Sequence, residues 1–136
     1  MLKTAKDDHV RIDTVNIMAM NYGPYYDKQK VSMLEQAKKA ITATETNIAA
    51  LGLNAKIGIT QMIGLNNDTD EIFHLDEAKA LVDYIKNDPK VALLGMWSMA
   101  RDNGGSAGSH IVEPDSSGIA QNTWDFAHIF HTFDKS

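Results

Sequence analysis

The sequence predicts an α/β fold, because three short apolar runs are each followed by a stretch with helical periodicity. The runs are residues 15–20, 56–62 and 91–97, and apolar residues occupy both alternating positions in each. A run that is apolar on both faces is typical of a buried strand in a parallel sheet. Strands that alternate with helices predict parallel βα units joined by helical crossovers.

Two amphipathic helices are predicted after the first two strands. The first covers residues 28–51 and ends at Gly52, a typical C-terminal stop. Its inward candidates are Val31, Leu34, Ala37 or Lys38, Ile41, Ile48 and Leu51. The second covers about residues 75–86, and Asp76 and Glu77 in its first turn suit the helix dipole. Its inward candidates are Ala78, Leu81, Val82 and Ile85.

A third helix is predicted from Thr123 to about Phe133, after the last strand. Asn122 is the expected N-cap, and Asp125, three residues on, is placed to reach back as in a capping box. The inward candidates of this helix are Trp124, Ala127, Phe133 and either Phe130 or Ile129. The complete pattern is therefore strand and helix, three times.

The spacing of the strands predicts part of a (β/α)8 barrel. Successive strands begin about 41 and 35 residues apart, near the spacing implied by about 250 residues for eight units. Residues 1–136 hold three such units and no linker, so we expect a single region that forms the C-terminal part of a longer barrel. Residues 103–121, rich in Gly, Ser and Asp, exceed a typical connection and predict a working loop.

Composition narrows the classes of partner. The formal net charge is -5, and no Lys/Arg cluster is interleaved with aromatic residues, so neither nucleic acid nor an anionic membrane is an expected partner. No run approaches the roughly 18 to 20 apolar residues of a membrane span. The chain has no cysteine, which excludes thiolate chemistry and cysteine-ligated metals. The first residues lack the apolar core of a signal peptide, so the compartment stays unassigned.

Candidate binding residues follow the three strands, where ligands gather in parallel α/β folds. They are Met20, Asn21 and Tyr22 after the first strand, Gln61 and Met62 after the second, and Trp97 and Ser98 after the third. Amides, a phenol, thioethers and an indole suit a neutral ligand rich in hydroxyl groups, whose C–H faces stack on an aromatic ring. A sugar is the ligand that this pattern favours.

Metal, calcium and nucleotide sites are weaker interpretations, and no metal or cofactor is expected. His128, His131 and Asp125 share a helix, but nothing in the sequence completes a closed ligand set. Residues 66–71 lack the glycine and the glutamate spacing of a calcium loop, and they predict a solvated loop. The glycines after residue 103 lack the Lys-Ser/Thr of a phosphate-binding loop.

Three strings carry a resemblance to a known family. They are VNIMAMNYG at residues 15–23, IGITQMIG at residues 57–64 and MWSMARDN at residues 96–103. In this order and spacing they resemble strands six, seven and eight of family 18 chitinases. Residues 117–130 are similar to that family's closing helix, so the resemblance covers essentially the whole chain.

The resemblance implies a retaining glycosidase in which the N-acetyl oxygen of the substrate attacks the anomeric carbon, in place of an enzyme nucleophile. The family's general acid ends a D-x-x-D-x-D-x-E motif on strand four, which no window of this chain matches. The five glutamates are Glu35, Glu45, Glu71, Glu77 and Glu113, all on predicted helices or loops. The expected partners are therefore chitin or N-acetylglucosamine oligosaccharides and an N-terminal half of the barrel, without which the chain would be inactive. A typical chitinase would be secreted.

The resemblance also assigns roles to single residues. Trp97 matches the strand-eight tryptophan that stacks beneath the sugar at the cleavage subsite. Met18, Met20 and Asn21 match a strand-six pattern that often reads Met-x-Tyr-Asp, so Asn21 holds an auxiliary catalytic position with an amide in place of the acid. Tyr22 is a candidate to replace the missing tyrosine. Gln61 and Met62 match strand seven and are expected to line the pocket.

Each of these roles has a simpler structural alternative. Trp97 could be a core indole, the methionines could be packing residues, and Asn21 could cap a turn. The chain could also be a binding module that holds chitin oligomers without cleaving them, or an unrelated small α/β protein.

Overall fold

A computed structural model describes residues 1–67 and 70–133 of the chain. The elements are, in order, α1 (Leu2–Asp7), β1 (Thr14–Ala19), α2 (Pro24–Asp27), α3 (Met33–Ala50), β2 (Lys56–Met62), β3 (Gly64–Leu65), β4 (Ile72–Phe73), α4 (Leu75–Ile85), β5 (Val91–Trp97), a short 3₁₀ turn η1 (Met99–Arg101) and α5 (Asp125–His131).

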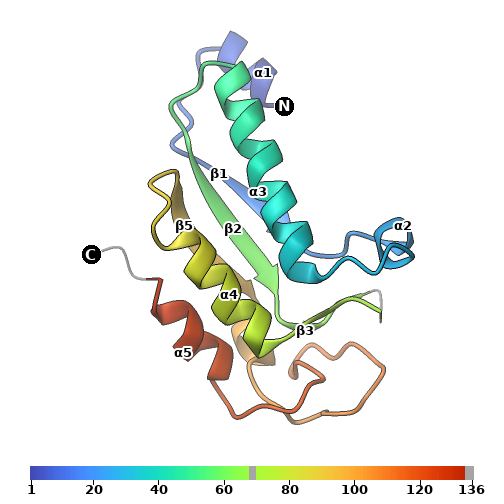
Figure 1. The fold of residues 1–136 in the computed structure, drawn as a ribbon. Coiled ribbons are helices and arrows are strands. Elements are labelled where there is room, and N and C mark those ends of the chain that lie inside the picture. The colour runs from blue at the N-terminus through green and yellow to red at the C-terminus, as the bar shows by residue number, and fades with distance from the viewer. Residues whose placement is uncertain (68–69, 134–136) are drawn as a thin grey trace.

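The predicted α/β fold is confirmed. Strands β1, β2 and β5 form a parallel sheet in the order β1-β2-β5, and β2 and β5 have the predicted bounds. Helices α3 and α4 lie along one face of this sheet, with α5 beside α4 (Figure 1). The second strand is therefore central, and each of the other two has one neighbour among the described strands.

Burial differs between the two faces of the sheet. The face under the helices holds the core, which includes Ile57 and Ile59 of β2. On the opposite face, which we call the helix-free face, Met18 of β1 is 61% exposed and Leu93 of β5 is 44% exposed. The prediction of burial on both faces is thus right for β2 but wrong for β1 and β5, because no described segment covers their second face.

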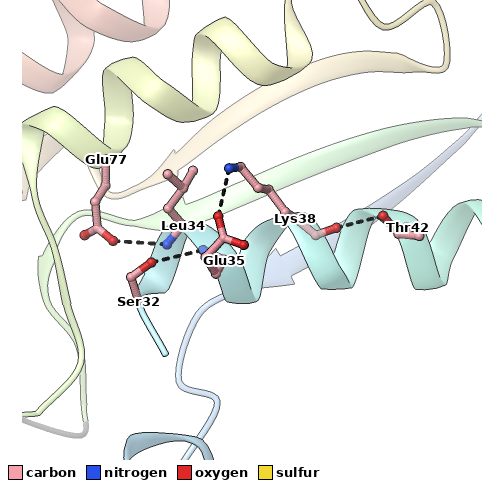
Figure 2. Close-up of polar contacts among 6 residues, drawn as sticks. All are labelled: Ser32, Leu34, Glu35, Lys38, Thr42 and Glu77. Carbon is pink, nitrogen blue, oxygen red and sulfur yellow. Dashed lines mark hydrogen bonds and ion pairs between the residues drawn. The ribbon is translucent and has the colours of Figure 1, made fainter. Parts of the chain in front are cut away.

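Helix α3 begins at Met33, five residues later than predicted. The Ser32 hydroxyl caps it by accepting the Glu35 N–H at 3.2 Å. A carboxylate oxygen of Glu77, from the first turn of α4, accepts the Leu34 N–H at 3.1 Å (Figure 2). Its other oxygen accepts the N–H of His74, the N-cap of α4, at 3.1 Å. One side chain therefore serves the first turns of two helices.

Helix α5 has a different cap from the predicted one. Its N-cap residue is Trp124, in a left-handed conformation with φ 70°. Buried Asp102 accepts the N–H groups of Phe126 at 3.1 Å and Ala127 at 2.8 Å. Asp125 does accept the Asn122 N–H at 2.8 Å, as in half of a capping box. This cap turns Phe126 into the core and leaves Trp124 44% exposed, so the inward assignment of Trp124 is wrong.

The segment predicted as a solvated loop is buried at both ends. Strands β3 and β4 pair antiparallel on either side of this segment, of which residues 68 and 69 lie outside the described residues. Asn66 is 0% exposed and Glu71 is 4% exposed. Asn66 donates to the Met62 and Gly64 carbonyls, both at 3.1 Å, which holds the hairpin against the end of β2.

Candidate functional site

Two of the predicted site residues meet where the strands end. Met62 ends β2, Trp97 ends β5, and the two are partners in the parallel register. Both belong to the helix-free face and line a cavity of about 260 Å³. Trp97 is 53% exposed, whereas Met62 is 3% exposed. The remaining described residues around this cavity are Asn67, Ser98, Arg101, Val112, Glu113 and Pro114.

Arg101 fixes the loop that forms one wall of the cavity. Its side chain is 2% exposed, and it donates to the Ile63 and Leu65 carbonyls at 3.0 and 2.6 Å. A third hydrogen bond, of 2.5 Å, reaches the Glu113 carbonyl. Burial lowers the pKa of Arg101, but a guanidinium stays charged. A buried cation thus ties residues 112–114 to the chain that follows β2.

The end of the same loop packs closely against the chain that follows β2. Gly64 has φ 67°, and a Cβ atom there would lie 2.1 Å from the Ser117 carbonyl oxygen. The neighbouring Leu65 N–H donates to that oxygen at 2.8 Å. Only glycine allows both the positive φ and this approach, so Gly64 lets the long loop return to the hairpin.

Met18, Met20 and Asn21 lie along or just beyond β1. Met18 is exposed on the helix-free face, and Met20 is partly buried past the strand end. The side-chain Oδ1 of Asn21 accepts the Asn67 backbone N–H at 2.8 Å, and its side-chain Nδ2 lies 4.0 Å from the Met62 sulfur. Asn21 therefore links the end of β1 to two residues of the cavity wall. Its own backbone lies in the left-handed region, with φ 52°.

The Tyr22 side chain packs against the core and not against the cavity beside Trp97. Its ring packs against the core and meets Tyr26 edge to face, and its hydroxyl is buried without a hydrogen-bond partner among the described residues. Burial and then the charge of Glu71 raise the pKa of Tyr22 well above its ordinary value. Glu71 accepts the Tyr22 and Gly23 N–H groups at 3.0 and 2.7 Å. Tyr22 is not among the described residues that line the cavity.

Gln61 lies on the face of the sheet that the helices cover. It precedes Met62, so the alternation of a strand turns it away from the cavity. Its side chain is 0% exposed. Neither side-chain polar atom has a hydrogen-bond partner within residues 1–67 and 70–133.

A larger cavity, of about 680 Å³, lies near the first turns of α3 and α4. None of the predicted site residues is among its described lining. The helix N–H groups of Leu34 and His74 there are already taken by Glu77. We therefore regard the smaller cavity beside Trp97 as the candidate site, because it combines an exposed aromatic ring with the carboxyl ends of the strands.

Neither a group of metal ligands nor a membrane-spanning helix is present among the described residues. Within the described part of the chain, no group of three or more His, Cys, Asp or Glu side chains is arranged to hold a metal ion. No described helix has the length and apolar character needed to cross a bilayer.

Sequence reasoning missed several residues of the cavity wall, among them Arg101 and Glu113. Arg101 lay inside the string that resembles strand eight, but its buried contacts are with residues 36 and 38 positions away. Glu113 lies within a loop whose path depends on those contacts. A lone arginine after a strand is the only sequence signal for either residue.

The known proteins that this chain resembles in sequence are chitinases. No family model matches the chain. It is 26% identical to the probable bifunctional chitinase/lysozyme of Escherichia coli K12 over 150 aligned residues, which cover 99% of this chain and 16% of that protein. It is 27% identical to endochitinase 11 of Metarhizium anisopliae over 114 residues, which cover 75% of this chain and 22% of that protein.

Solved structures agree with these relatives. The catalytic domain of a hyperthermophilic chitinase from Pyrococcus furiosus matches 97% of this chain with a TM-score of 0.84 and 30% identity. A catalytic-site mutant of active domain 2 of a thermostable chitinase from Pyrococcus furiosus, complexed with chito-oligosaccharides, matches with a TM-score of 0.83. The chain spans 43% of each of these domains. Over most of its length, the chain therefore has a chitinase-like family 18 fold, with its three parallel strands as part of the barrel.

Proposed function

We propose that this chain forms part of the sugar-binding cleft of a chitinase-like glycoside hydrolase, with Trp97 as the platform for an N-acetylglucosamine ring. Similarity to chitinases supports the class of reaction. The observation that carries the proposal is the half-exposed Trp97 ring, which lines a cavity at the carboxyl end of β5. Indole rings favour the apolar C–H face of a pyranose.

The surroundings of Trp97 suit a sugar. Met62 and Val112 provide apolar contact, while Asn67 and Ser98 bring polar groups to the same cavity. At about 260 Å³, the cavity lies below the roughly 300 Å³ at which ligand pockets usually begin. We infer that it holds one ring of an oligosaccharide, and that Met18 and Asn21 contact the ring or its neighbour from the side of β1.

The chain by itself would bind without cleaving. In the complete enzyme, we propose, the acid of a D-x-x-D-x-D-x-E motif protonates the leaving oxygen while the substrate's acetamide attacks the anomeric carbon with retention. This chain has no such motif. Among its own glutamates, Glu71 is engaged by backbone N–H groups, and Glu113, which lines the cavity, stands in no such motif. We propose that residues 1–136 form the C-terminal part of the barrel and that the N-terminal βα units supply the acid.

The experiment is a pair of tryptophan substitutions measured on the immobilised chain by surface plasmon resonance. We expect Trp97→Ala to weaken binding of an N-acetylglucosamine oligosaccharide at least about tenfold, or about 1.4 kcal/mol. Trp124→Ala is the matched control, since Trp124 is also about half exposed but is the N-cap residue of α5 and is not among the described residues that line this cavity. Equal affinity of the Trp97 variant and the wild type would refute the proposal.

A second candidate function is a module that binds chitin oligosaccharides and never contributes to hydrolysis. The absent acid motif favours it. The two functions separate when the chain is refolded with the N-terminal barrel portion of a related chitinase. Recovery of oligosaccharide hydrolysis supports the role in an enzyme, and unchanged binding without turnover supports the module.

A further inference from the structure

We propose that Glu113 is a second sugar-binding residue, whose carboxylate accepts hydrogen bonds from hydroxyl groups of the ring stacked on Trp97. The inference rests on the proposed function and adds a specificity-determining contact to it. Glu113 belongs to the long loop after β5 and lines the same cavity as Trp97 and Met62. No part of the family resemblance set out above assigns it a role.

The main chain of Glu113 is fixed independently of its side chain. Its carbonyl accepts a hydrogen bond of 2.5 Å from buried Arg101, which also holds Ile63 and Leu65. The next residue is Pro114, which restricts Glu113 to an extended backbone. The loop therefore holds position 113 at the cavity wall through backbone contacts, and a substitution of the side chain leaves those contacts in place.

The Glu113 carboxylate is available for a ligand. It is partly exposed, and no described residue forms a hydrogen bond or ion pair with it. An ionised carboxylate accepts hydrogen bonds at two oxygens and cannot donate, so it matches the hydroxyl donors around a pyranose. Such bonds to a charged group are among the stronger ones in proteins.

The arrangement divides recognition between two sides of the cavity. Trp97, at the end of β5, offers a flat ring for the apolar face of the sugar, whereas Glu113, in the loop, offers acceptors for its polar edge. An aromatic platform alone binds many sugars. A fixed acceptor beside it selects those with a hydroxyl group in reach, because a site built for hydrogen bonds loses affinity for ligands that lack the donor.

The test compares Glu113→Gln with Asp115→Asn by surface plasmon resonance, with a tetramer of N-acetylglucosamine on the immobilised chain. Glu113→Gln removes the charge with little change of shape, and we expect binding about tenfold weaker, as for one hydrogen bond to a charged group. Asp115→Asn removes the same charge from an exposed position in the same loop, and we expect wild-type affinity. Circular dichroism verifies that both variants remain folded.

The outcomes separate this inference from the proposed function. Weaker binding by Glu113→Gln, with wild-type binding by Asp115→Asn, supports the role of Glu113. Wild-type binding by Glu113→Gln, together with loss in Trp97→Ala, overturns the inference and leaves the proposed function standing. Equal loss in the Glu113 and Asp115 variants also overturns it, since the effect would then be one of overall charge. Absence of binding by the wild type overturns both.

Discussion

At the scale of single residues, Tyr22 couples stability to alkaline pH. Its hydroxyl is buried without a partner among the described residues, and burial, followed by the charge of Glu71, raises its pKa. In the unfolded chain the pKa of tyrosine is about 10. Because the folded state holds this proton more tightly, the contribution is constant below pH of about 10 and is lost as pH rises above it.

We therefore expect the free energy of unfolding of the wild type to fall more steeply than that of Tyr22→Phe above pH of about 10. The difference in slope approaches about 1.4 kcal/mol per pH unit. At pH 7 the variant should be no less stable, since it loses no hydrogen bond. Urea unfolding between pH 7 and 11 measures both effects. Tyr25→Phe, at a position 71% exposed, should follow the wild type, and parallel curves for Tyr22→Phe would contradict the assignment.

At the scale of secondary-structure elements, Glu77 joins the first turns of α3 and α4. Its two oxygens accept the Leu34 and His74 N–H groups, each at 3.1 Å. Glu77→Ala leaves both donors without their acceptor, so we expect the free energy of unfolding to fall by about 2 kcal/mol, the sum of two capping bonds. Glu77→Gln, with a single acceptor oxygen, should fall between this variant and the wild type.

Glu35 provides the control for that measurement (Figure 2). Its carboxylate pairs with Lys38 at 2.8 Å on the exposed side of α3, where such pairs contribute about 0 to 1 kcal/mol. In urea unfolding at pH 7, Glu35→Ala should therefore cost less than Glu77→Ala. Equal losses would mean that Glu77 acts only as another surface charge.

The same capping contacts explain which elements could be predicted from the sequence. Strands β2 and β5 were predicted with the right bounds, and α4 within one residue, because their signals are local runs and periodicity. The start of α5 was wrong, because its cap is Asp102, more than twenty residues away along the chain. The start of α3 is marked locally by the Ser32 cap, a signal that the prediction overlooked, whereas the second acceptor there, Glu77 of α4, is distant in sequence. A sequence pattern cannot reveal caps that only the folded chain brings together.

At the scale of the whole molecule, one part of the candidate site could be predicted from the sequence and another part could not. Trp97 and Met62 could be placed side by side from the sequence, since both end parallel strands and such ends meet at one edge of the sheet. Glu113 could not, since its position depends on the buried contacts of Arg101 with three separate carbonyls. Strand geometry therefore predicts the platform of the site, while the loop wall requires the structure.

The helix-free face also has a consequence for the behaviour of the chain in solution. Met18, Leu93 and Trp97 are 61%, 44% and 53% exposed on this single face, and large exposed apolar side chains gathered on one face promote association. We expect the purified chain to self-associate, with a sedimentation coefficient that rises with concentration. Leu93→Lys places a charge on the β5 side of this face and should shift the chain towards the monomer. Val10→Lys adds the same charge at an exposed apolar position before β1 and should leave association unchanged. A wild-type chain that sediments as a monomer at all concentrations would show that this face is stable in water, and the proposal that the chain is one part of a larger barrel would then lose this physical support.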